Sequence, residues 1–148
     1  MVINDVGIVE SAIDVTGLNA PLSYYTTVTA QIWFPHSNNV DLAIYLYGAD
    51  GSYMTLSYHK GLTFSNVFDG TLFTDSAPNS VSNYPFSKNG VVSPLKPEDR
   101  LTYFGGRNPN GQWKIWASDY IPIIGSGRLN AFILNIQGLY SFSFFLFF

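Results

Sequence analysis

Four aspartates at predicted strand ends or in loops are the side chains of this sequence best suited to metal chemistry: Asp41, Asp69, Asp75 and Asp119. Hard cations such as Ca²⁺ take about six to eight oxygen ligands, in which carboxylates are mixed with carbonyl groups. The alternative is that each aspartate caps a turn by accepting hydrogen bonds from nearby backbone. Asp50 is followed by glycine, which favours the turn for that residue. A structural Ca²⁺ site is therefore one prediction for these aspartates, and turn capping is the other.

Histidines are the other side chains that could do chemistry, and the chain has two, His36 and His59. No G-x-S-x-G nucleophile elbow, H-E-x-x-H zinc motif, P-loop or G-x-G-x-x-G segment accompanies them. His36 ends a predicted strand, which favours a structural role, and His59 lies in a polar turn where we expect it to be solvated. We therefore predict that the chain has no catalytic residues and is not an enzyme.

Charge and cysteine content argue against several classes of function. Charged residues make up 11% of the chain and the formal net charge is -3. The basic residues are scattered and do not form the stripe that nucleic-acid binding needs. The net negative charge also argues against binding to an anionic membrane surface. The chain has no cysteine, so neither a disulfide nor a cysteine-based metal site can form.

The elements that position these residues are short apolar segments with the period of a β-strand. In residues 112–118, Trp113, Ile115 and Ala117 fall on one side of the chain, which indicates a strand with one buried face. Asn110-Gly111, just before it, is a strong signal for a hairpin turn. Residues 59–100 are rich in turns. The other predicted strands cover residues 2–9 or 12–15, 25–35, 41–47, 53–58, 101–104 and 128–137.

Short strands separated by turns, with no long helical period, predict an all-β fold. At 148 residues the chain is long enough to bury a sizeable core in one domain. We expect an antiparallel β-sandwich with jelly-roll-like topology. The residues predicted for its core are Ile44, Leu46, Trp113, Ile115, Leu129 and Ile133.

Five segments that follow one another in residues 11–137 carry a family resemblance. They are TTVTAQIWFPH at 26–36, VDLAIYLYGADGSYMTL at 40–56, NVFDGTLFTDSA at 66–77, LTYFGG at 101–106, and GQWKIWASD with GRLNAFIL at 111–134. Their order resembles the P domain, also called the P/Homo B domain. That domain follows the catalytic domain in kexin- and furin-like proprotein convertases and occurs in secreted bacterial proteases. The turn at 48–52, GADGS, departs from the Ser-Pro-x-Gly-Thr that is usual in the family.

The resemblance implies a non-catalytic accessory domain over residues 1–137 that stabilises a neighbouring subtilisin-like protease domain. It also implies that Asp41 and Asp75, whose counterparts bind structural calcium in some members, come close in space and share a Ca²⁺. Asp69 and Asp119 are further candidates for ligands. An extracellular location, or one at a cell or virion surface, is expected, although no signal peptide is visible at the start of the chain.

Residues 138–148, GLYSFSFFLFF, depart from the family and are expected to form a separate apolar tail. The tail is too short to span a membrane as a helix, and its alternation predicts a strand. The strand could lie on the protomer's own sandwich, or it could be donated to a neighbouring subunit. In the second arrangement Phe142, Phe144 and Phe147 would be buried at an interface of a homo-oligomer.

Three functions are compatible with these features of the sequence. The first is an accessory domain that binds a protease domain. The second is a structural jelly-roll protein, such as a virion or surface-fibre subunit, whose tail binds copies of itself. The third is a carbohydrate-binding module, because Trp33, Trp113, Trp116 and the tyrosines could stack on sugar rings. Neither a nucleic acid nor a membrane is expected as a partner.

Overall fold

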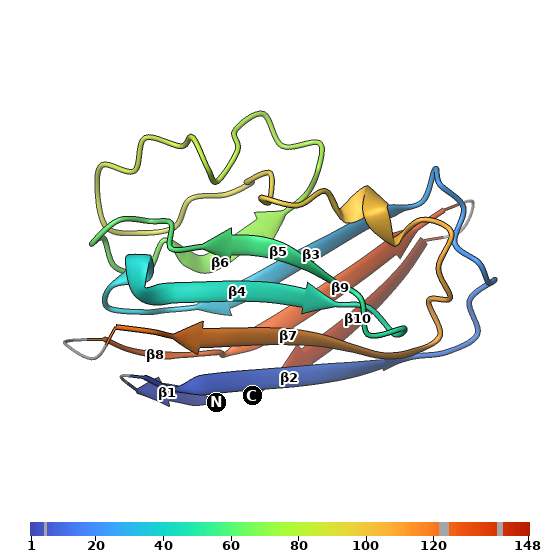
Figure 1. Cartoon of the computed structure of the whole chain (residues 1–148), viewed down its shortest axis with the longest axis horizontal. Coiled ribbons are helices and arrows are strands. Elements are labelled where there is room, and N and C mark those ends of the chain that lie inside the picture. The colour runs from blue at the N-terminus through green and yellow to red at the C-terminus, as the bar shows by residue number, and fades with distance from the viewer. Residues whose placement is uncertain (5, 122–124, 139–140) are drawn as a thin grey trace.

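The computed structural model describes residues 1–4, 6–121, 125–138 and 141–148. Two four-stranded antiparallel sheets face each other (Figure 1). One has the order β2 (Ile8–Val15), β7 (Gly111–Asp119), β4 (Leu42–Tyr47) and β5 (Tyr53–Tyr58). The other has the order β10 (Ser141–Phe147), β9 (Ala131–Gln137), β3 (Thr27–Phe34) and β6 (Phe68–Phe73). The prediction of an all-β antiparallel sandwich is confirmed.

Three smaller elements complete the fold. A two-stranded ribbon joins β1 (Val2–Asn4) to β8 (Ser126–Arg128). Two short 3-10 helices, η1 (Asn39–Asp41) and η2 (Leu101–Phe104), precede β4 and β7. Among the described residues, no helix has the length and apolar character that crossing a membrane requires.

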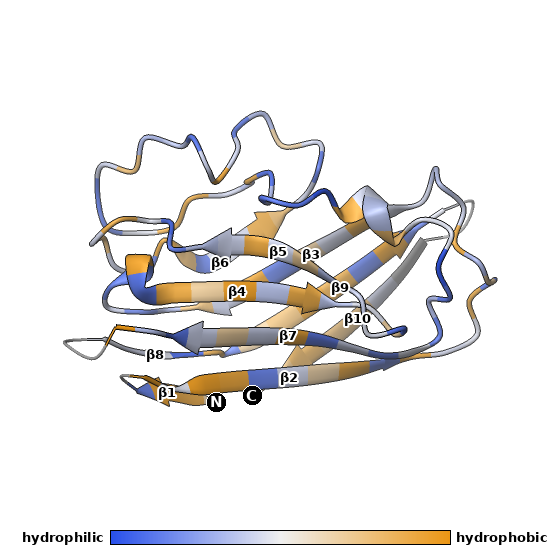
Figure 2. Cartoon of the chain, viewed as in Figure 1, coloured by the Kyte–Doolittle hydropathy of each residue, from blue (hydrophilic) through white to orange (hydrophobic). Residues whose placement is uncertain are grey.

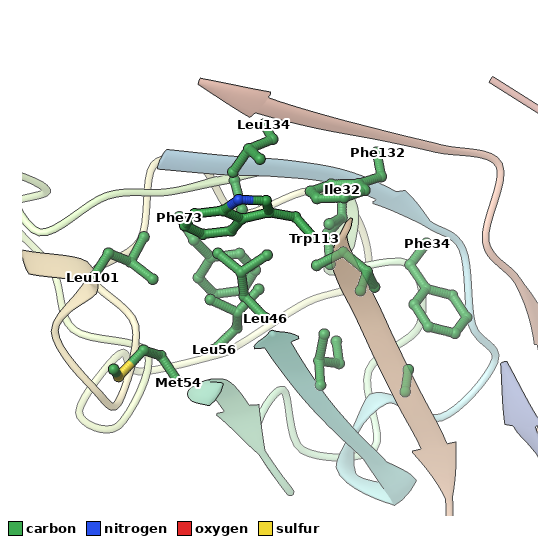
Figure 3. Close-up of a cluster of buried hydrophobic side chains, with 14 of the residues drawn as sticks. Ile32, Phe34, Leu46, Met54, Leu56, Phe73, Leu101, Trp113, Phe132 and Leu134 are labelled. Atoms are coloured by element: carbon green, nitrogen blue, oxygen red, sulfur yellow. The ribbon is translucent and has the colours of Figure 1, made fainter. Parts of the chain in front are cut away.

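The core lies between the two sheets, and strand alternation explains its composition. Along β3 and through the middle of β7 the buried side chains fall at every second position, so each of these strands turns one apolar face toward the other sheet. Figure 2 shows that hydrophobic and hydrophilic residues are mixed along the strands. Trp113 is 1% exposed and its ring centroid lies 4.8 Å from that of Phe104. Figure 3 shows the indole among side chains from both sheets. Burying one such large side chain contributes roughly 1.5–3 kcal/mol.

Of the residues predicted for the core, Ile44, Leu46, Trp113, Ile115 and Leu129 are buried, but Ile133 is not. Ile133 lies on the outer face of β9 and is only half-buried. The inward positions of that strand are Phe132, Leu134 and Ile136. The whole segment is apolar, so its composition did not reveal which alternate positions face the core.

Residues 101–104 form the 3-10 helix η2, so the strand predicted there was wrong. The hairpin at Asn110-Gly111 is also absent, because β7 begins at Gly111 and pairs with β2 and β4. The Asn110 side chain accepts a hydrogen bond from the Leu18 N–H at 2.9 Å and donates one to the Leu18 carbonyl at 2.8 Å. Asn110 therefore links the start of β7 to the loop that follows β2.

Candidate functional site

The outer surface of the β2-β7-β4-β5 sheet carries a group of aromatic side chains that we call the aromatic face: Tyr45, Tyr47, Tyr53 and Trp116. Strand alternation turns them away from the core, and pairing places Tyr45 opposite Trp116 and Tyr47 opposite Tyr53. The ring centroids of Tyr45 and Trp116 are 5.5 Å apart, and those of Tyr47 and Tyr53 are 5.2 Å apart. The rings of Tyr45 and Tyr53 meet edge to face at 5.6 Å. These four side chains therefore form one continuous group.

The aromatic face is accessible to a partner. Tyr53 is 54% exposed, and the other members are half-buried. Burial, followed by the neighbouring tyrosines, raises the pKa of the Tyr45 hydroxyl, so that hydroxyl stays protonated and can donate a hydrogen bond. An exposed ion pair between Lys114 and Glu10, 3.8 Å apart, comes from the same outer face of β7 and β2. Ring surfaces with hydroxyl donors and a charged border can bind another molecule.

A second feature, the buried polar cluster, lies where several strands begin or end. It consists of His36 after β3, Asn38 before η1, Asp41 at the end of η1, and Asp119 at the end of β7. His36, Asp41 and Asp119 are only 1%, 1% and 2% exposed. The His36 Nε2 atom lies 3.1 Å from Asp119 Oδ2, and its Nδ1 atom is 2.9 Å from the Asn38 carbonyl oxygen. Asn38 donates a 2.6 Å hydrogen bond to Asp41 Oδ2.

Gly125 allows the buried polar cluster to close. A Cβ atom at this position would lie 2.7 Å from Asp119 Oδ2, 3.0 Å from His36 Cε1 and 3.4 Å from Asp41 Oδ2. The glycine therefore lies against all three side chains, and a larger residue would force them apart. The two carboxylates and the imidazole therefore all lie close to the position that a Cβ atom of residue 125 would occupy.

Electrostatics at Asp41 are unfavourable for its charged form. Burial, opposed by the Asn38 hydrogen bond and reinforced by the nearby Asp119 carboxylate, raises the pKa of Asp41. The Asp41 Oδ1 and Asn38 Oδ1 atoms are buried and have no hydrogen-bond partner among the residues that the structure describes. Unpaired buried acceptors of this kind cost free energy.

Of the four aspartates predicted as metal ligands, only Asp41 and Asp119 lie in this cluster. Asp75 instead accepts hydrogen bonds from the backbone N–H groups of Leu101 and Thr102, both at 2.9 Å. It thereby caps η2, which lies at the other end of β4 from η1 (Figure 1), so the expected pairing of Asp41 with Asp75 is not formed. Asp69 lies in β6, opposite Trp33. In the described part of the chain no group of three or more His, Cys, Asp or Glu is arranged to hold a metal ion. Calcium binding stays a prediction.

The tail is a strand, and its aromatic side chains are divided between two faces. β10 pairs antiparallel with β9 of the same chain. Phe144 packs against the core, whereas Phe147 is 69% exposed. Phe145, which is not among the predicted interface residues, is 59% exposed, and its ring stacks on that of Phe147 at a centroid distance of 6.4 Å. Phe142 pairs with Ile136 through the backbone, but its side chain lies outside the described part.

Sequence reasoning missed most of the aromatic face. The opposite parity of Trp116 and Trp113 on one strand was a usable signal for Trp116. For Tyr45, Tyr47 and Tyr53 the signal was also alternation, since Ile44 and Leu46 face the core. The sequence predicted that residues 53–58 pair back onto residues 41–47 through the Asp50-Gly51 turn, as β5 does with β4. It did not show that β7 pairs with the other side of β4, because β7 is far from both strands along the chain.

Of the comparisons with known proteins, the one with solved structures found a protein that shares the β-sandwich fold. No protein-family profile matches the chain, and no curated protein matches it. Among solved structures, the serine protease of Aeromonas sobria superposes with a TM-score of 0.50 at 15% sequence identity. The match covers 98% of this chain and 21% of the protease chain. The chain thus spans about a fifth of the length of that protein, and the likeness shows a shared β-sandwich fold.

Proposed function

We propose that this chain is a non-catalytic accessory domain that binds a partner protein domain through the aromatic face. The observation that carries the proposal is the contiguous group of Tyr45, Tyr47, Tyr53 and Trp116 on an open sheet surface. Tyrosine and tryptophan are enriched at the centres of protein–protein interfaces, where large rings give contact area at a small cost in conformational entropy. The face has that composition.

A subtilisin-like protease domain is the partner that we propose. Two observations support it: the order of the five P-domain-like segments in the sequence, and the fold shared with part of a serine protease chain. The role would be to stabilise the protease domain, in an extracellular setting. The partner would supply the catalytic groups, since the His36 ring bonds to Asn38 and Asp119 in the interior.

The ring geometry favours a protein over a sugar as the occupant. Adjacent rings of the aromatic face are tilted by 87°, 52° and 35°. A sugar chain is best held by rings that present parallel faces, whereas tilted rings leave gaps that the side chains of a protein partner can fill. Carbohydrate binding is kept as the alternative that the experiment below would reveal.

The experiment is capture from the secreted proteins of the source organism, followed by reconstitution with the purified partner. We expect the unchanged chain to bind a protease domain and to raise its melting temperature. The double variant Tyr53→Ser, Trp116→Ser should lose both effects. Tyr25→Ser is the matched control, because Tyr25 is 95% exposed and outside the aromatic face.

Two results would contradict this proposal. One is that no protease domain is captured. The other is that the double variant binds as well as the unchanged chain. Quenching of tryptophan fluorescence by soluble oligosaccharides, lost in Trp116→Ser, would instead support the carbohydrate-binding alternative.

Self-assembly is a second candidate function, favoured by a different observation. The exposed and stacked rings of Phe145 and Phe147 lie on β10, an edge strand. An apolar edge strand is a template for pairing with another chain. We propose that copies of the chain associate through this strand, independently of the aromatic face.

A further inference from the structure

β10 pairs within the chain along one backbone edge, while no described strand of its own sheet pairs along the other, although part of β10 comes close to β2 of the facing sheet. It is the outermost strand of its sheet, and its seven paired positions all face β9. Among the described strands, none of the same sheet lies along the opposite edge, which presents the N–H and C=O groups of alternate residues. Natural proteins protect such edges with charges, prolines or bulges. Residues 141–147, SFSFFLF, contain no charge and no proline, and the pairing with β9 has no bulge.

The two faces of β10 differ in how well they are covered. Phe144 and Leu146 pack against the core of the sandwich. On the outer face, Phe145 and Phe147 stack with an interplanar angle of 10° and remain 59% and 69% exposed. Ser143 also points outward, where its hydroxyl donates a hydrogen bond to Asn135 on β9. The outer face is therefore a short apolar strip that follows this edge.

We propose that two copies of this chain pair through β10, antiparallel and about a two-fold axis, so that the two four-stranded sheets join into one eight-stranded sheet. This inference rests on the self-assembly proposed above and names its partner and geometry. A second copy is the occupant because the edge carries no charge: two copies meet without repulsion, although the chain as a whole has a net charge of -3. Two-fold pairing also makes the contact closed, since each copy uses the same strand.

Strand geometry restricts the possible registers. Residues directly opposite each other in an antiparallel pair have side chains on the same face of the sheet. The two-fold axis keeps the outer faces of both copies on the same side, so outward residues oppose outward residues. Each permitted register is then centred on one residue that faces its own copy.

Backbone overlap and aromatic contact select among these registers. A register centred on Phe144 pairs residues 141–147. A register centred on Phe145 pairs residues 142–148, which is equally long, because Phe148 continues the ladder with a 2.9 Å bond to the Asn130 carbonyl oxygen. Only the second places Phe145 against Phe145 of the other copy, and cross-strand aromatic pairs are favourable. We therefore assign the register in which Phe147 opposes Ser143.

The contact involves one strand from each copy, so association should be weak. Interfaces below about 1,200 Å² are typical of transient complexes. We expect a dissociation constant in the micromolar to submillimolar range. Sedimentation equilibrium over about 10–500 µM protein covers most of that range.

Disulfide trapping tests the register, and the absence of native cysteine makes single-cysteine variants unambiguous. In the assigned register the two Cα atoms of residue 145 are about 4.5–5.5 Å apart, within reach of a disulfide. Phe145→Cys should therefore form a covalent dimer under mild oxidation. Residue 147 opposes residue 143 of the other copy, so the two copies of residue 147 are four residues apart along the strand direction, or about 13 Å. Phe147→Cys alone should therefore not cross-link. A mixture of Phe147→Cys with Ser143→Cys should give the mixed dimer.

A charge at the centre of the contact tests pairing in solution. Phe145→Lys places two like charges opposite each other and should weaken dimerisation by at least about tenfold. The matched control is Ile8→Lys, because Ile8 is 65% exposed on β2, the edge strand of the other sheet. That variant should dimerise like the unchanged chain.

The outcomes separate failure of this geometry from failure of self-assembly. A chain that is monomeric at about 500 µM contradicts both proposals. Loss of association on deletion of residues 141–148, with efficient cross-linking of Phe147→Cys rather than Phe145→Cys, would keep self-assembly and overturn the assigned register. An unchanged dissociation constant in Phe145→Lys would also overturn strand pairing. Neither result would affect binding through Tyr53 and Trp116.

Discussion

The interior of this sandwich has two regions that are equally closed to water but filled with different chemistry. In the centre, Trp113 packs against apolar side chains and needs one polar contact, a 2.7 Å hydrogen bond from its Nε1 atom to the Pro109 carbonyl oxygen. At one end, His36, Asp41 and Asp119 are just as buried but depend on hydrogen bonds to one another and to neighbouring residues.

The difference concerns what each region contributes to stability. Apolar burial contributes in proportion to area and is insensitive to pH. A buried polar group contributes little net free energy when paired, but a large cost appears when its partner is removed. The centre should therefore determine how stable the fold is, and the cluster should determine how stability changes with pH.

The largest expected effect is in the centre. Trp113→Ala leaves a cavity between the sheets and should lower the free energy of unfolding by about 3–5 kcal/mol. Urea denaturation measures this, and the loss should be the same at pH 5 and pH 8. Trp116→Ala, on the outer face of the same strand, should cost less than half as much. Equal losses for the two variants would contradict the assignment of faces.

A smaller loss is expected when the cluster is broken. Asp119→Ala removes the partner of His36 Nε2 and the acceptor of the Ile121 N–H. Leaving a buried ring nitrogen unpaired should cost about 1–3 kcal/mol. Asp14→Ala is the control, because Asp14 is exposed on β2. If both substitutions are neutral in urea denaturation, the cluster does not support the fold.

The pH dependence of the cluster has a definite sign. Burial, and then the Asp119 carboxylate, raise the pKa of Asp41 above its ordinary 3.8 despite the Asn38 hydrogen bond. Between 3.8 and the raised value the folded state binds the proton more tightly than the unfolded state. The contribution of Asp41 to stability therefore rises as pH falls through its raised pKa. The charges of His36 and His59 lower the pKa of this carboxyl group, but by less than burial raises it.

Asp41→Asn removes the titrating group and should remove this part of the pH dependence. Unfolding free energies measured from pH 7 to pH 4, in chelator, should differ in slope between the variant and the unchanged chain. Parallel curves would contradict the effect. Repeating the series in calcium tests the predicted metal site. A cation held by Asp41 and Asp119 would raise the melting temperature and reduce the slope of the unfolding free energy against pH.

The smallest effect is expected at the surface, where Arg107 and Asp50 form a 2.8 Å ion pair. Burial raises the pKa of Asp50, but hydrogen bonds from Ser52 and Arg107 outweigh it and hold the pKa at about 2. This contribution is present above pH 3.8 and is lost as pH falls toward 2. The pair is 41% and 34% exposed, so Arg107→Gln should cost below about 1 kcal/mol at pH 7. Acid denaturation of the two proteins checks this value.

Local patterns in the sequence predicted the fold class and most of the core. Alternation in residues 112–118 placed Trp113 and Ile115 inward, because a strand with one buried face has period two. The same reasoning could not place Ile133, since its neighbours on both faces are apolar. Residues 101–104 became η2 because Asp75, distant in sequence, caps their N–H groups.

The sites were harder to predict than the fold, because they join segments that are far apart in the chain. Asp41 and Asp119 meet only after β4 pairs with β7. The chemistry of both residues was visible in the sequence, but their distance from Asp75 was not. In the tail, the serine and phenylalanine alternation predicted a strand, while the double phenylalanine at 144–145 hid which side would stay exposed.

The two ends of the chain lie next to each other (Figure 1). The Met1 amino group bonds to the Leu129 carbonyl oxygen at 3.0 Å, and the Phe148 N–H bonds to the neighbouring Asn130 carbonyl oxygen at 2.9 Å. Adjacent ends of this kind are what circular permutation and insertion into a host loop require. We therefore expect the sandwich to fold when it is inserted into a surface loop of another protein, with both connections made at one point and the aromatic face left free.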